Sequence, residues 1–250
     1  MKSKFAGNKI ENNLRQITKD MSKEMNMTKE NQEKDLEIKL KEQQYNSLEE
    51  LLAEMDKCRF CQEKFGHEPR PVSFGHPHAK IMHISQAPSK KVHAIGRPFS
   101  DLSGDRLRND WYKISKEQFY NPDYFYFTTV GHCFPGKGPK GGDKKPPKCC
   151  YEFWTSKEIE LMDSAELYLV VGGEAASRIF PKRKLSELIM EDLELNGKPC
   201  FVLPHPSPLN MNYFRDHPEF IEQRIPLIRN KIHDIIGLNQ DKPETEILQF

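Results

Sequence analysis

The sequence lacks three features that would each have indicated a class of protein. It has no run of about eighteen apolar residues, so we predict no membrane-spanning segment. Its opening residues, MKSKFAGNKIENNLRQ, contain no apolar signal-peptide core, so we expect a reducing, cytoplasmic location. It also lacks a large net charge: 38 Lys and Arg against 37 Asp and Glu give only +1 at pH 7. Global charge therefore indicates no polyanionic partner, and only local charge can do so.

Hydrophobic residues are scarce too, at 36% of 250 residues, and the deficit lies mainly in the first 45. A stretch so rich in Lys, Glu, Asn and Gln cannot bury enough surface to offset its ordering entropy. We expect residues 1–45 to be a flexible or loosely helical charged extension. A solvated tail is favoured over a helix that docks on a protein partner. The remainder is expected to form one domain over residues 46–237 and a loose tail over 238–250.

The chain does have cysteine. Cys58 and Cys61 form a Cys-x-x-Cys pair, and Cys133 and the adjacent Cys149 and Cys150 follow later. In a reducing compartment this pattern favours a four-thiolate metal site over disulfides. Ligand count alone leaves zinc and an iron–sulfur cluster equal, and it leaves the fourth ligand open between Cys149 and Cys150.

The pattern of apolar runs predicts an α/β fold. Strands are expected over residues 80–84, 124–130, 167–171 and 200–203, the last opening with a core cysteine, Cys200. Helices are expected over 48–55, 103–111, 150–162, 174–179 and 219–236, with Ser47 and Glu50 as a capping box. Their alternation predicts a central, mostly parallel four-stranded sheet flanked by helices on both faces.

Three unusual loops follow predicted strands. They are SQAPS at residues 85–89, the loop that contains Cys133, and PHPSP at residues 204–208. Ligands of open parallel sheets bind beyond the carboxyl ends of the strands. We therefore expect these loops to converge on one edge of the sheet.

In that order, and with the four cysteines, these loops resemble the uracil-DNA glycosylase superfamily, and most of all its iron–sulfur families 4 and 5. The family motif Gly-Glu-Ala-Pro-Gly, followed by Gly-Arg-Pro-Phe, corresponds here to residues 85–89 and 96–99. The resemblance covers roughly residues 50–236. It implies a monomeric DNA repair enzyme that hydrolyses the N-glycosidic bond of a damaged base, usually uracil, and carries a structural [4Fe-4S] cluster. The family's spacing from Cys133 slightly favours Cys149 as the fourth ligand, whereas the register of the following helix, with Phe153 and Trp154 as its buried pair, favours Cys150.

The resemblance also implies roles for residues. The flipped base would contact Ala87 and Pro88 and stack on Phe99. His205, in the family's His-Pro-Ser motif, would donate to the O2 atom of the departing base and so stabilise the transition state. Ser207 would hold a flanking phosphate.

Two positions depart from the family 4 pattern. Gln86 replaces a glutamate, and an amide can only orient water; family 5 lacks that carboxylate as well. Thr129 replaces an asparagine that pairs with the uracil edge, and a hydroxyl has a single donor. Asp101 and Asp105 are the nearest spare carboxylates, though acids that begin a helix are the simpler interpretation.

The loop between Cys133 and Cys149 carries five lysines and one aspartate, which suits contact with phosphates as well as plain solvation. The resemblance as a whole implies a DNA glycosylase. The first alternative is a lesion- or single-strand-binding protein of the same fold that has lost hydrolysis. The second is a zinc-stapled module with no role in nucleic-acid binding.

Overall fold

The computed structural model describes residues 2–139, 141–207 and 210–239, and the chain divides into two compact units between Gln44 and Tyr45. The first unit is one α-helix, α1 (Lys2–Glu42). The expected tail lies outside the described residues from residue 240 onward. No described helix is both long enough and apolar enough to span a membrane.

The second unit is built on a five-stranded sheet in the order β2-β1-β3-β5-β4. Four strands are parallel: β1 (Ile81–Ser85), β2 (Phe125–Thr129), β3 (Leu167–Val171) and β5 (Lys198–Leu203). The predicted number of four strands was wrong, because β4 (Leu193–Leu195) adds an antiparallel edge. Only three residues long and half exposed, β4 has no apolar run by which the sequence could have revealed it.

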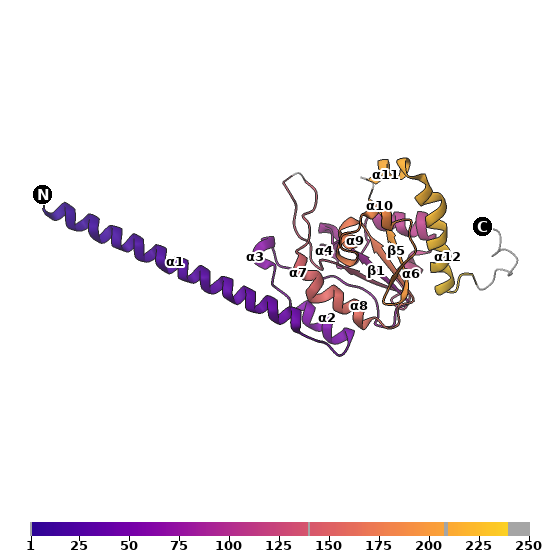
Figure 1. The fold of residues 1–250 in the computed structure, drawn as a ribbon, viewed down its shortest axis with the longest axis horizontal. Coiled ribbons are helices and arrows are strands. Elements are labelled where there is room, and N and C mark those ends of the chain that lie inside the picture. Colours follow the sequence, from indigo (N-terminus) through magenta and orange to yellow (C-terminus); the bar gives the residue numbers. More distant parts are fainter. Residues whose placement is uncertain (1, 140, 208–209, 240–250) are drawn as a thin grey trace. The chain divides into compact units, whose positions relative to one another are not determined.

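Helices cover both faces of this sheet. The chain moves one way from β1 to β2 and the other way from β2 to β3, so right-handed crossovers place the intervening helices on opposite faces. Figure 1 shows β1 and β5 between α8 and α12. The connection from β1 to β2 contains α4 (Lys90–Ile95), α5 (Leu102–Asp105), the π-helix η1 (Arg106–Tyr112) and α6 (Lys116–Phe119). The C-terminal helix α12 (Ile225–Ile235) packs on η1 and so covers the same face.

The opposite face begins with α2 (Leu48–Asp56), which packs on α8 (Ser156–Leu161). Ser47 caps α2 as predicted, but the Glu50 carboxylate accepts from the Asn46 amide and not from that of Ser47. Other helices of the unit are α3 (Gln62–Phe65), α7 (Lys148–Cys150), η2 (Tyr151–Thr155), α9 (Gly173–Ile179), α10 (Leu185–Leu188), α11 (Met211–Asp216) and η4 (Phe220–Arg224).

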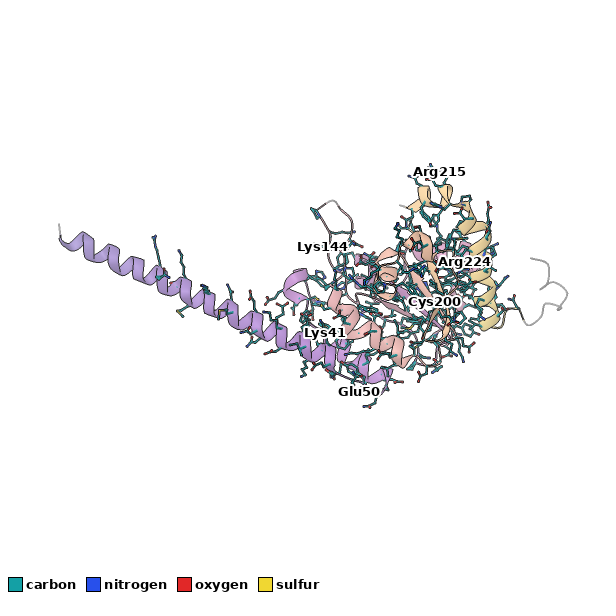
Figure 2. The ribbon with its side chains drawn as sticks, viewed as in Figure 1. Lys41, Glu50, Lys144, Cys200, Arg215 and Arg224 are labelled. Carbon is teal, nitrogen blue, oxygen red and sulfur yellow. The ribbon has the colours of Figure 1, made fainter. Side chains whose placement is uncertain are left out.

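The core lies between these layers. All of β1, β2 and β3 is buried, and Cys200 on β5 is 1% exposed, so the expectation of a core cysteine there is confirmed (Figure 2). Because every parallel strand points the same way, the residues that follow β1, β2 and β5 emerge at one edge.

Candidate functional site

A cavity of about 420 Å³ lies at the carboxyl ends of β1, β2 and β5. The three loops expected to converge meet there. Every non-metal site residue named from the sequence lines this cavity: Gln86, Ala87, Pro88, Phe99, Thr129, His205 and Ser207. Its volume falls within the range typical of small-molecule pockets.

His205 enters the cavity as a neutral imidazole with a defined tautomer. The Ser207 backbone N–H donates to Nδ1 at 3.2 Å, so the proton of the neutral ring sits on Nε2. Burial lowers the pKa of His205, against a smaller raising effect of Asp101. Gly172, at φ +91°, lies beside His205, and a Cβ there would only touch the ring at an ordinary contact distance of 3.5 Å. His205 thus offers one N–H donor to the cavity.

Two residues that sequence reasoning missed hold the His205 loop in place. Arg106 donates from Nη1 to the Pro206 carbonyl at 3.0 Å and to that of Ser207 at 3.4 Å. Asn210 donates from Nδ2 to the His205 carbonyl at 2.7 Å. The Arg106 contacts span about a hundred residues, so no local signal could have revealed them, whereas Asn210 lies five residues after His205 and was simply overlooked.

Phe99 has a left-handed backbone, with φ 51°. Such a conformation is disfavoured for an aromatic residue and persists only where the surroundings impose it. Tyr120 Oη donates to the carbonyls of Pro98 and Phe99, both at 2.9 Å. The Phe99 ring packs edge-on against buried His83, with 4.7 Å between ring centres. Gly104 permits the turn, since a Cβ there would collide with the Phe99 carbonyl.

The backbone pairing of β1 with β2 continues past both strands and orients Gln86 and Thr129, the two residues that depart from the family 4 pattern. Val130 donates to the Ser85 carbonyl and Gly131 to that of Gln86, at 2.8 and 3.1 Å. The Thr129 hydroxyl donates to the Gly131 carbonyl at 3.1 Å. Its single proton is therefore committed, and Thr129 presents only acceptor lone pairs to a ligand.

The nearby acids have structural partners. Asp101 lines the cavity, but its Oδ1 accepts from the Ser103 and Gly104 amides as the N-cap of α5. Asp105 pairs with Arg108. Both fit the interpretation of acids that begin a helix.

A second, smaller cavity gathers four cysteines. Cys58, Cys61, Cys133 and Cys150 line it together with mostly apolar side chains. Cys149 is not among its lining residues, so of the two adjacent cysteines it is Cys150 that shares the cavity with the other three. The reason is the helical register: Cys150 ends α7 on the side of buried Phe153 and Trp154.

The environment of these thiols suits a positively charged group. Burial, then the charges of Cys58 and Cys61, raises the pKa of Cys133 to about 12. Burial likewise raises the pKa of Cys150. Thiols of this kind ionise only when a cation compensates them, as a bound metal does. The donor set, four sulfurs in a mostly apolar cavity, therefore fits a thiolate-bound metal centre.

A buried polar network lies between the two cavities. The His132 amide donates to Cys150 Sγ at 3.4 Å, and His132 Nε2 contacts Glu158 Oε2 at 2.9 Å. Glu158, fully buried, also accepts from the hydroxyls of Tyr126 and Thr128, both at 2.6 Å. Burial raises the pKa of Glu158, but these partners together outweigh it and hold that pKa below its usual range. Thr128 itself lines the first cavity.

The lysine-rich loop borders the first cavity. Asp143 lines that cavity and pairs with Lys137 at 2.7 Å, which closes the loop on itself. Lys145 pairs with Glu174 at 3.0 Å. Lys144 and Lys148 are exposed, and Figure 2 shows Lys144 on the segment that stands out from the domain. Together with exposed Lys90, Lys91 and Arg97, the loop lends positive charge to the approach to the cavity.

Comparison with known families agrees with this geometry. A family model described as the uracil DNA glycosylase superfamily matches residues 72–229, which is more than half of the chain and includes all three cavity loops. The CxxC pair at Cys58 and Cys61 lies outside that match. The protein therefore belongs to the uracil DNA glycosylase superfamily, whose members act in glycosylase-type DNA repair.

Proposed function

We propose that the protein is a monofunctional DNA N-glycosylase that removes uracil, or another deaminated base, flipped out of DNA into the 420 Å³ cavity. One observation carries the proposal: a neutral His205 with its proton on Nε2 shares the cavity with the strained aromatic Phe99. A stacking ring and a fixed neutral donor are what recognition of an extruded base and stabilisation of its anion require.

In the proposed reaction the C1′–N1 bond breaks and its electron pair leaves with the base. The negative charge spreads to O2, where the Nε2–H of His205 donates to it. Water then attacks the oxocarbenium-like sugar and loses a proton to solvent or to the departing base. Gln86 can orient that water by hydrogen bonds but cannot take its proton.

Thr129 would recognise the edge of the base differently from the asparagine amide of family 4. An acceptor-only Thr129 suits the N3–H of uracil and offers nothing to its O4. We therefore expect weaker discrimination among bases that carry a ring N–H donor than an asparagine would give.

We further propose that Cys58, Cys61, Cys133 and Cys150 bind a [4Fe-4S] cluster with a structural role. Among the described residues no three of these sulfurs lie within 4.8 Å of one another. One zinc ion at about 2.3 Å from each thiolate would hold them roughly 3.8 Å apart. A cubane, in which each cysteine binds a different iron, needs the wider spacing. The cluster would join α2, the end of β2 and α7 and leave the hydrolysis to the cavity.

The first experiment is turnover. Protein purified without oxygen is incubated with single- and double-stranded DNA that contains one uracil, and alkali then reveals abasic sites. Many abasic sites per protein molecule support the proposed enzyme. Retarded DNA in a gel with no free base released would overturn it.

That second outcome would favour a binding protein of the same fold. The absence of a carboxylate at Gln86 and the committed proton of Thr129 are the observations on its side. Repeating the turnover assay with hypoxanthine- and xanthine-containing DNA separates a changed substrate from lost chemistry.

The metal content of the purified protein tests the proposal of a [4Fe-4S] cluster. Iron and acid-labile sulfide near four per chain, with broad visible absorbance, support it. Stoichiometric zinc in a colourless protein would replace it with a zinc site and would leave the glycosylase proposal standing.

A further inference from the structure

Two histidines and an aspartate converge at the end of the sheet away from the cavity. His76 Nδ1 lies 2.7 Å and His78 Nε2 lies 2.8 Å from the same oxygen, Oδ1 of Asp123. Among the described residues, this is the group of His, Cys, Asp and Glu side chains whose ligand atoms all lie within 4.8 Å of one another. The three side chains precede β1 and β2, whereas the cavity lies beyond the carboxyl ends of those strands.

The backbone holds these side chains together independently of their own contacts. The His76 amide donates to the Pro122 carbonyl at 2.9 Å, and the Lys80 amide donates to that of Asp123 at 3.2 Å. The Asp123 amide donates to Asn121 Oδ1 at 2.9 Å. Two short loops are thus fastened to each other on both sides of the cluster.

The residues between and before the histidines restrict the loop further. Pro77 separates the two rings and fixes one backbone torsion. Gly75, at φ +127°, lies against β2 so closely that a Cβ would be 2.4 Å from the Phe125 carbonyl. Ser164 donates to the carbonyls of Pro77 and Ala79, at 2.7 and 3.0 Å.

The spacing of the rings matches that around a metal ion. Two imidazoles bound to one tetrahedral zinc at about 2.0–2.1 Å place their ring centres roughly 5 Å apart. The centres of His76 and His78 are 5.1 Å apart. A carboxylate oxygen and two imidazole nitrogens would need to separate by about half an ångström from their hydrogen-bonded distances to admit the ion.

We propose that His76, His78 and Asp123 form a surface site for a divalent transition-metal ion of the zinc class, with a fourth position left to water. Imidazole and carboxylate ligands suit such an ion. The site is separate from the cysteine cavity in its residues and in its nitrogen and oxygen donors. It requires neither the glycosylase activity nor the cluster.

Binding is measured on the full chain with its cysteine centre intact, after dialysis against a chelator. Zinc chloride is titrated by calorimetry, and cobalt chloride is titrated in parallel by absorbance. We expect one equivalent per chain beyond the resident metal. Cobalt should show weak d–d bands without the thiolate charge-transfer absorbance that binding at cysteines would give.

The variants are His76→Ala and Asp123→Asn, the second of which keeps the side chain's shape. Each should weaken zinc binding by more than about tenfold, the lower end of what loss of even an outer-shell partner does. His217→Ala, which removes another exposed histidine paired with an acid, serves as the matched control and should bind as the parent does.

Absence of the additional equivalent in the parent protein would overturn the proposal and leave a histidine–aspartate ion pair. Equal binding by the parent and Asp123→Asn would overturn it as well. Melting curves without metal check that each variant is folded, which is expected because all three side chains are exposed.

Discussion

The two cavities of the glycosylase domain differ in how complete they are without a ligand. In the 420 Å³ cavity that we propose binds the base (the base cavity), His205, Thr129 and Asp101 already have protein partners, and Arg106 and Asn210 fasten the loop. In the cysteine cavity, buried thiols with raised pKa values face one another among apolar walls. The fold alone organises the first, whereas we propose that a bound metal completes the second. Glu158 and His132 join the two.

The largest effect should come from the cysteine cavity. Cys150→Ser removes a ligand of the proposed metal centre, so we expect loss of bound metal and a fall in Tm of more than about 10 °C, since roughly 1 kcal/mol shifts Tm by 2–4 °C in a domain of this size. Cys149→Ser, one residue earlier and outside the cavity, should change Tm by less than about 2 °C. Thermal melts and metal analysis of both variants check this. Equal loss in the two variants would contradict the assignment of Cys150.

The next effect tests the link between the cavities. Glu158→Gln removes a buried charge from the His132, Tyr126 and Thr128 network and should destabilise the domain by about 3–5 kcal/mol, as broken buried pairs do. Chemical denaturation measures this. Glu160→Gln changes an exposed acid on the same helix and should have almost no effect. A stable Glu158→Gln variant would mean that the two cavities are independent.

How far the sequence predicted these regions depends on whether the contacts are local. The four parallel strands, the cap at Ser47 and seven of the residues that line the base cavity could be located from runs and motifs. Arg106, His83 and Glu158 could not, because they act through contacts made across the sheet or between distant loops. Cys149 and Cys150 could not be separated from sequence, because the spacing from Cys133 favoured Cys149 and the register of the following helix favoured Cys150.

A substitution in the base cavity should slow the release of the base without lowering the stability of the domain. His205→Ala removes the donor to the departing base and should slow base release by about 10²–10³-fold, equivalent to 2.7–4 kcal/mol of barrier. Single-turnover kinetics on uracil-containing DNA measure the rate, and a melt should show Tm unchanged within a few degrees. His217→Ala is the control for loss of a histidine elsewhere on the domain. A rate that stays at the parent value would remove His205 from the proposed mechanism.

The smallest effect is a pH dependence that comes from the histidines at the base cavity. Burial lowers the pKa of His83, beneath Phe99, to about 3, and burial also lowers that of His205. Above pH 6.5 neither the folded nor the unfolded chain protonates His83, so its full contribution to stability is present there. As pH falls from 6.5 toward 3, His83 binds a proton in the unfolded chain but not in the folded chain, so the free energy of unfolding decreases.

At pH 5 this loss should reach about 2 kcal/mol for His83 alone. Denaturation at pH 7 and pH 5 measures it, and His83→Gln, which keeps an acceptor for the Tyr112 hydroxyl, should flatten the dependence. A parent protein equally stable at both pH values would show that His83 can be protonated in place, and that the floor of the base cavity is wetter than its packing indicates.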